Sequence, residues 1–188
     1  LLQYLNHHRI DQCVVLGHSM GGKTAMAFAL QYPDRLQKLI IADIAPKYYA
    51  PHHQQILAGL STLNLDEVSS RKNAAEHLEN FIPEAGTRQF LLKNLYWVSE
   101  GKLGLRANIA VLKNASEAIG AAIQSQNQYH QPTLFLYGEN SNYINPKTDT
   151  EILQYFPRAE MIEINGAGHW LHAEQPLLFF KTLIQWLA

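Results

Sequence analysis

Four short, mainly apolar runs along the chain have the pattern of β-strands. They lie at 12–16, 37–43, 132–137 and 159–164. The first three are almost continuously apolar, as expected of parallel strands with both faces covered. Stretches with helical periodicity lie between and after the runs, at about 20–32, 146–155 and 173–187. This alternation predicts an α/β fold with a mostly parallel sheet and right-handed crossovers.

A long interval between the second and third runs breaks the alternation. From about 46 to 130 the pattern is helical and contains no convincing strand. The helical patterns in this interval lie at 52–60, 66–80, 84–98 and 106–127. We therefore expect a helical cap formed by 46–130, inserted into an α/β core made of 1–45 and 131–188. Ligands bind at the carboxyl ends of the strands in such sheets, so we expect the cap there.

A candidate nucleophile follows the first apolar run. The segment Gly17-His18-Ser19-Met20-Gly21 fits G-x-S-x-G, in which a sharp strand-to-helix turn exposes a serine. Because a serine hydroxyl is a weak nucleophile, it needs a neighbouring base and N–H donors for the oxyanion. We expect Ser19 to be the nucleophile and the Met20 N–H to be an oxyanion donor. The flanking glycines are expected because a Cβ there would clash in so tight a turn.

The same stretch also fits a second pattern. Residues 17–24 match G-x-x-x-x-G-K-[ST], a phosphate-binding loop, and the apolar run ending at Asp43 offers a magnesium-binding aspartate. This alternative predicts a nucleotide-binding phosphotransferase. It leaves the second half of the chain unexplained and places the bulky Met20 in a loop that wraps phosphates, so the hydrolase is favoured.

The candidate base is His169, one of nine histidines in the chain. It follows the last strand and a glycine-rich turn and precedes a helix, which is where a base must lie to reach Ser19. The usual position of the orienting acid, after the third of the four runs, is occupied by Ser141. Asp43 can serve instead, fixing the tautomer of His169, and Ser141 can add a hydrogen bond to the same pair. Glu139 is the second choice for the acid.

Other residues near these positions carry weaker signals. His18 lies within the elbow turn and Trp170 follows the base. Both are candidates for contact with substrate, although packing explains either residue as well. His172 and His169 have the spacing of a metal pair, but no third ligand is evident, so we expect no metal and place His172 at a helix start.

Composition narrows the function classes. The chain has 188 residues, 47% of them hydrophobic and 16% charged, with a formal net charge of −1. No basic cluster suggests nucleic-acid binding, and no apolar run approaches the roughly 18 residues of a membrane span. The chain has a single cysteine, Cys13, which excludes a disulfide framework. Cys13 lies in a predicted buried strand. These features predict a cytoplasmic protein with a small-molecule substrate and no cofactor.

Several segments resemble those of the YbfF-type esterases, bacterial α/β-hydrolases related to the eukaryotic α/β-hydrolase domain proteins. They are 17–23, 42–46, 90–93 and 166–174. The resemblance implies a carboxylesterase that acts on short or medium acyl esters or thioesters. It also implies that Ser19, Asp43 and His169 form the catalytic triad.

The resemblance further implies several strands before the elbow, whereas this chain reaches the elbow about a dozen residues after Leu1. We therefore expect the N-terminal strands to be absent, together with the loop that supplies the second oxyanion donor. A hydrolase-fold binding module with impaired catalysis is thus a third interpretation. The strand that carries Ser19 would form an open sheet edge, through which the chain would self-associate.

Overall fold

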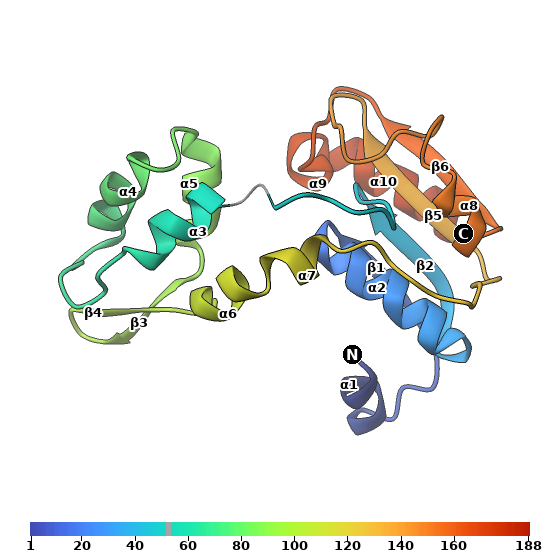
Figure 1. Cartoon of the computed structure of the whole chain (residues 1–188), viewed down its shortest axis with the longest axis horizontal. Helices are drawn as coiled ribbons and strands as arrows, with labels where there is room; N and C mark the ends of the chain where they lie inside the picture. Colours follow the sequence, from blue (N-terminus) through green and yellow to red (C-terminus); the bar gives the residue numbers. More distant parts are fainter. Residues whose placement is uncertain (52–53) are drawn as a thin grey trace. The chain divides into compact units, whose positions relative to one another are not determined.

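The computed structural model describes residues 1–51 and 54–188 (Figure 1). The chain divides into two compact units, one formed by 1–48 and 122–188, and the other by 49–121. The second unit is shorter than the cap expected at 46–130. The difference at its end arises because Tyr129 is fully buried in the first unit, where its hydroxyl donates to Leu36 O and its N–H to Tyr155 O.

The first unit contains a four-stranded parallel sheet in the order β1-β2-β5-β6. Its strands are β1 (Cys13–His18), β2 (Leu36–Ala42), β5 (Thr133–Gly138) and β6 (Ala159–Ile164). Each strand covers one of the four predicted apolar runs to within two residues at either end. The expected α/β fold with a mostly parallel sheet is confirmed.

The helices of this unit lie before, between and after the strands. They are α1 (Leu2–His7), α2 (Met20–Gln31), the 3-10 turn η1 (Pro33–Arg35), α8 (Glu151–Tyr155), α9 (Leu171–Glu174) and α10 (Pro176–Leu187). The helix expected at 173–187 is divided because Pro176, which cannot donate an N–H, opens α10. None of the helices in the described part of the chain is long and apolar enough to cross a membrane.

Alternate residues of β2 pack against helices on opposite faces of the sheet. Ile41 faces α2, since a Cβ added to Gly22 of that helix would lie 3.2 Å from Ile41 Cγ2. Ile40 belongs to a buried cluster with residues of β5 and β6, on which α10 packs. Side chains of α10 in this contact include Phe179, Leu183 and Trp186. Both faces of β2 are therefore covered, as the apolar pattern predicts.

The expectation of two covered faces is wrong for β1. Val14 and Leu16 share one face of the strand, and they are 40% and 45% exposed. The strand is also an edge strand, because it pairs on one side only within the described residues. Cys13 is correspondingly half-buried rather than buried, and that partial burial raises the pKa of its thiol. A continuous apolar run thus identifies the strand but does not show whether both of its faces are covered.

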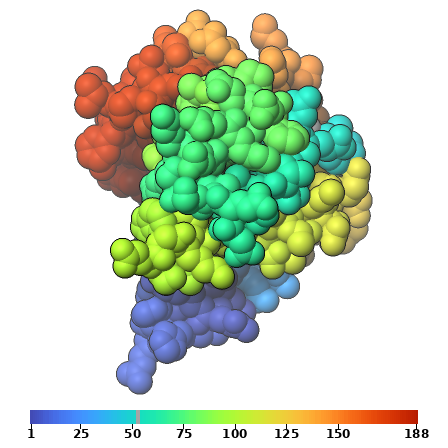
Figure 2. Space-filling model, turned by 90° about the vertical axis from the view of Figure 1, so that its left-hand side faces the viewer, coloured from blue at the N-terminus to red at the C-terminus, as the bar shows by residue number. Residues whose placement is uncertain are grey.

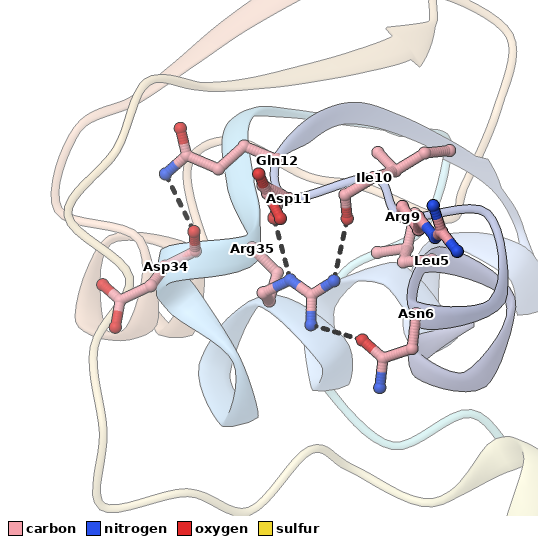
Figure 3. Close-up of a pocket in the computed structure, with 8 residues that line it drawn as sticks. All are labelled: Leu5, Asn6, Arg9, Ile10, Asp11, Gln12, Asp34 and Arg35. Atoms are coloured by element: carbon pink, nitrogen blue, oxygen red, sulfur yellow. Dashed lines mark hydrogen bonds between the residues drawn. The ribbon is translucent and has the colours of Figure 1, made fainter.

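Helix α1 (dark blue) projects from the remainder of the first unit (Figure 2). Its junction with β1 is held by the Arg35 guanidinium, which donates to Asn6 Oδ1, Ile10 O and Asp11 O (Figure 3). These groups border an open hollow of about 650 Å³. All three acceptors of the guanidinium belong to the protein, so Arg35 has a structural role here. We therefore interpret the hollow as the junction between α1 and η1 and not as a ligand site.

The second unit has its own apolar core, which includes Leu78, Leu95 and Leu103. Its elements are α3 (Gln54–Ser61), α4 (Arg71–Glu79), α5 (Ala85–Leu92), β3 (Leu95–Ser99), β4 (Lys102–Leu105), α6 (Ile109–Asn114) and α7 (Ser116–Gly120). The first two residues of the helix expected at 52–60 lie outside the described residues.

The prediction that this region contains no strand is wrong. The helix expected at 84–98 ends at Leu92, and β3 and β4 form an antiparallel hairpin. The run Tyr96-Trp97-Val98 favours a strand because aromatic and β-branched side chains pack well on a pleated surface. Gly101 closes the hairpin with φ +72°, a conformation that side chains other than glycine rarely adopt.

Candidate active site

Ser19 occupies the sharp turn between β1 and α2. The strand ends at His18 and the helix begins at Met20, so a single residue makes the turn, with φ +53° and ψ −122°. The Ser19 N–H donates to Ala42 O on β2, and Ser19 O accepts the N–H groups of Gly22 and Lys23. The turn is thus held by hydrogen bonds on both sides of a strained residue.

Two glycines allow this turn. They are Gly17, which was expected, and Gly22, which takes the place of the expected Gly21. A Cβ at Gly17 would lie 2.4 Å from Gly21 O, so the expectation for Gly17 is confirmed. At Gly21 nothing lies within 4 Å of an added Cβ, and that expectation is wrong for the described residues. The second close approach is at Gly22, where the Cβ would lie 2.5 Å from Ile44 Cγ2.

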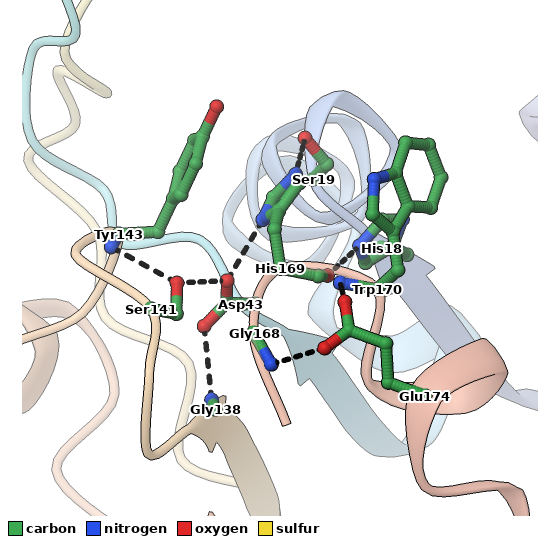
Figure 4. A network of polar contacts seen from close by, with 10 residues as sticks. All are labelled: His18, Ser19, Asp43, Gly138, Ser141, Tyr143, Gly168, His169, Trp170 and Glu174. Carbon is green, nitrogen blue, oxygen red and sulfur yellow. Dashed lines mark hydrogen bonds and ion pairs between the residues drawn. The ribbon is translucent and has the colours of Figure 1, made fainter. Parts of the chain in front are cut away.

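The structure brings Ser19, His169 and Asp43 together at the carboxyl ends of the strands (Figure 4). His169 Nε2 lies 3.0 Å from Ser19 Oγ, and Nδ1 lies 2.7 Å from Asp43 Oδ2. Since a carboxylate only accepts hydrogen bonds, the proton lies on Nδ1, which leaves Nε2 free to accept the serine hydroxyl. The three residues form one continuous hydrogen-bonded chain.

Asp43 is fully buried, so its charge needs polar partners. Besides His169, Oδ2 accepts the Ser141 hydroxyl, and Oδ1 accepts the Gly138 N–H at 3.2 Å. Ser141 Oγ in turn accepts the Tyr143 N–H at 3.2 Å. Both Ser141 and Tyr143 follow β5, so the loop after this strand supports the Asp43 carboxylate.

Aromatic rings surround the imidazole of His169. Tyr143 stacks on it with ring centres 3.9 Å apart and planes 17° apart. The His18 ring lies 4.8 Å away, and its Nε2 donates to His169 O at 2.8 Å. Burial lowers the pKa of His18, which favours its neutral form. Trp170 lies 5.3 Å from His18, so the two residues predicted to contact substrate are neighbours beside the candidate base.

Two glutamates hold the loop that carries His169. Glu139, the second choice for the acid, accepts the Gly166 N–H at 2.7 Å and makes no contact with His169 in the described structure. Glu174 accepts the N–H groups of Gly168 and Trp170. Neither Glu174 nor Tyr143 is predicted from the sequence as part of the site. The signal for Glu174 was its position five residues after His169, in the helix that follows.

The geometry disfavours a phosphate-binding loop at 17–24. Helix α2 already begins at Met20, and the N–H groups of Gly22 and Lys23 donate to Ser19 O. A phosphate cradle needs such N–H groups to point into an open loop. The Lys23 ammonium donates to Lys47 O at 2.8 Å, and burial lowers its pKa. Residues 17–24 therefore match the sequence pattern of a phosphate-binding loop but form the elbow turn and the first residues of α2.

Among residues 1–51 and 54–188, no three His, Cys, Asp or Glu side chains are placed to hold a metal ion. His172 is exposed on α9, at the helix start where the sequence places it, with its ring 5.0 Å from that of His18.

Comparisons with known proteins identify the family of the chain. The family described as serine aminopeptidase, S33, matches residues 2–176. The sn-1-specific diacylglycerol lipase ABHD11 of Mus musculus is 39% identical over 94% of this chain and 59% of its own length. Esterase YbfF of Escherichia coli is 34% identical over 100% of this chain and 72% of its own length. The chain thus spans about 60% of the length of the ABHD11 relatives.

A solved structure named marine microorganism esterase has the same fold, with a TM-score of 0.94 and 36% identity. That match covers 98% of this chain and 74% of the other. The same fold, the elbow around Ser19 and the family match over nearly the whole sequence lead to one conclusion. The chain belongs to the S33-type α/β-hydrolases, and within them it is related to the YbfF-type esterases.

Proposed function

We propose that this chain carries the nucleophile, base and acid of a carboxylic ester hydrolase that works through an acyl-serine intermediate. The observation that carries the proposal is the continuous hydrogen-bonded chain from Ser19 through His169 to Asp43. Relatives named esterase and diacylglycerol lipase support the same reaction class. The elbow, which presents Ser19 at the start of α2, suits acyl transfer better than phosphate binding.

In the acylation step, Ser19 Oγ attacks the carbonyl carbon of the ester while its proton passes to His169 Nε2. Asp43 stabilises the resulting imidazolium through its hydrogen bond to Nδ1. The carbonyl oxygen becomes an oxyanion near the start of α2, where the Met20 N–H is among the N–H groups without a partner inside the helix. Collapse of the tetrahedral intermediate breaks the ester bond, and Nε2 returns the proton to the leaving alcohol or thiol.

Deacylation repeats these steps with water as the nucleophile. His169 Nε2 accepts a proton from water, the hydroxyl attacks the acyl carbon, and Ser19 leaves with the proton that Nε2 returns. The products are a carboxylic acid and the free serine. Because the same imidazole serves both steps, His169 must keep its position throughout the cycle.

The surroundings of the serine and the names of the relatives support a substrate class. Trp170 and His18 lie beside His169, so aromatic rings line this side of the site. Aromatic rings suit the apolar acyl chain of an ester better than a charged substrate group. Esters and thioesters with short or medium acyl chains fit this description.

The proposal is tested by incubating the chain with a fluorophosphonate probe and mapping the labelled residue. We expect labelling at Ser19 that is lost in Ser19→Ala and in His169→Ala. Ser61→Ala, at an exposed serine of α3, is the control and should label normally. Hydrolysis of p-nitrophenyl esters of increasing acyl length then defines the acyl preference. A folded chain that is not labelled, and that hydrolyses none of these esters, would refute the proposal.

A further inference from the structure

A single carboxylate spans the base of the proposed triad. Glu174 Oε2 accepts the Gly168 N–H at 2.6 Å, and Oε1 accepts the Trp170 N–H at 3.1 Å (Figure 4). These two amides flank His169 in the sequence. The contact therefore fixes the backbone immediately before and immediately after the imidazole.

Helix capping explains only one of these two hydrogen bonds. Glu174 is the last residue of α9 (Leu171–Glu174), and Trp170 is the N-cap of that helix. A side chain that reaches back to the N-cap N–H is a familiar capping interaction. The Gly168 N–H lies two residues before the N-cap, outside the helix, so its hydrogen bond has a different consequence.

The segment that carries His169 has little intrinsic rigidity. It follows Gly166-Ala167-Gly168, with Gly166 at φ +73°, and glycines lose more conformational freedom than other residues when they are fixed. Yet the imidazole must lie within hydrogen-bonding distance of Ser19 and Asp43 at once. Contacts outside the triad must therefore hold this backbone, because a base displaced by about 1 Å costs a large factor in rate.

We infer that Glu174 is a positioning residue for the base, whose carboxylate sets the distance from His169 to Ser19 by binding the amides on both sides of it. The inference rests on the proposed function. The carboxylate suits this role because it has two accepting oxygens, one for each amide, and is exposed, so its charge stays hydrated.

Glu174→Gln separates this role from simple packing. Glutamine has the same shape but one accepting oxygen, and its NH₂ group would face the second amide N–H. Glu139→Gln is the matched control, at a second glutamate that binds a backbone N–H of the same loop. Glu139 accepts a single N–H, that of Gly166, so the glutamine oxygen can still accept it.

We expect Glu174→Gln to lower kcat for ester hydrolysis roughly 10- to 100-fold, the cost of a misplaced base, with KM unchanged. Glu139→Gln should retain activity within about twofold, since its hydrogen bond is preserved. The melting temperatures of both variants are measured alongside, so that lost activity is not confused with unfolding.

A second measurement does not depend on turnover. We expect the proton on His169 Nδ1, in its 2.7 Å hydrogen bond to Asp43, to give a strongly deshielded resonance in the proton NMR spectrum. We expect Glu174→Gln to shift or broaden this resonance and Glu139→Gln to leave it unchanged. If the wild-type chain hydrolyses no ester, the proposed function fails, yet the resonance still tests the role of Glu174.

Three results would overturn the inference. The first is Glu174→Gln with wild-type kcat and an unchanged resonance, and the second is an equal loss in Glu174→Gln and Glu139→Gln. The third comes from hydrogen exchange in the wild type. This measurement tests the role of Glu174 even if the variant does not fold or the resonance is not seen. We expect protection of the Gly168 and Trp170 amides, and exchange as fast as in an unstructured loop would refute the role.

Discussion

Two of the three proposed triad residues have strained backbones. Ser19 and Asp43 both have φ +53°, a region that costs residues other than glycine about 1–3 kcal/mol. Each is held there by neighbours: the Ser19 N–H donates to Ala42 O, and the Asp43 N–H donates to Leu136 O. The strain therefore lies at the two ends of the hydrogen-bonded chain, where the rest of the fold can hold it.

The role of Asp43 is tested by Asp43→Asn. We expect kcat to fall by about 10⁴, because an amide that donates toward Nδ1 favours the wrong tautomer of His169. The new NH₂ group would also meet the N–H of Gly138 or the hydroxyl of Ser141, which should cost about 1–3 kcal/mol of stability. Steady-state kinetics and thermal unfolding measure both effects. Full activity in Asp43→Asn, with a loss in Glu139→Gln, would make Glu139 the acid instead.

The stacked ring of Tyr143 gives a second prediction. Tyr143→Phe keeps the ring against His169 and should retain kcat, whereas Tyr143→Leu should lose up to about tenfold, since aromatic pairs contribute about 0.5–1.5 kcal/mol. The comparison of kcat in the two variants is the measurement. An equal loss in both would assign the effect to the hydroxyl rather than to the ring.

The pKa of His18 predicts how stability depends on pH. Burial lowers this pKa below its ordinary value of about 6.5, so between the two values the unfolded chain binds more protons than the folded one. Stability contributed by neutral His18 is therefore present above about pH 6.5 and is lost as the pH falls toward the folded pKa. His18→Gln can still donate to His169 O and should lose less stability between pH 7.5 and pH 5, as measured by the melting temperature. An equal loss in wild type and variant would contradict this.

The sequence predicts the residues of the proposed triad better than most of the residues that support them. Ser19 and His169 lie in recognisable local patterns, and Asp43 and Ser141 follow strands, so their meeting at one sheet edge could be expected. Tyr143 had no such signal, because its contact with His169 depends on the path of the loop after β5 and not on the sequence around it.

At the scale of secondary structure, local patterns predict the central strands well and the second unit poorly. Strands β2 and β5 are largely buried on both faces, so each reads as an almost continuous apolar run that is easily recognised as a strand. In 84–98 the same apolar residues fit a helix or a strand, and the hairpin of β3 with β4 is decided by pairing across Gly101. Such pairing involves residues outside the window in which a period is read.

The elbow offers a matched pair of glycine variants. Gly17→Ala places a Cβ 2.4 Å from the backbone oxygen of Gly21, so the chain must shift, and we expect a cost of about 1–3 kcal/mol. Gly21→Ala meets nothing within 4 Å and lies inside α2, where alanine is favoured by up to about 1 kcal/mol. Thermal unfolding should therefore rank Gly21→Ala at or above wild type and Gly17→Ala well below it. The reverse order would refute this account of the turn.

At the scale of the whole molecule, the division into two units follows from separate apolar cores rather than from a linker composition. One core lies along β2, β5 and β6, and the other gathers the helices and hairpin of 49–121. The expected boundary at 130 placed Tyr129 in the cap, whereas Tyr129 is buried in the first unit. A single aromatic residue in an irregular segment forms no repeating pattern, so the sequence gives no sign of its burial. The segment 122–130 therefore belongs to the first unit, although the helical pattern expected at 106–127 extends into it.

The open side of β1 leads to the last prediction. Val14 and Leu16 are 40% and 45% exposed on a strand that pairs on one side only in the described part of the chain. Unpaired backbone groups beside exposed apolar side chains favour pairing with another chain. We expect light scattering to show a mass that rises with concentration, and Val14→Lys to reduce that rise. Val111→Lys, at a similarly exposed valine of the helix α6, is the control and should leave it unchanged. A monomer at every concentration would show that this edge is too short or too twisted to pair.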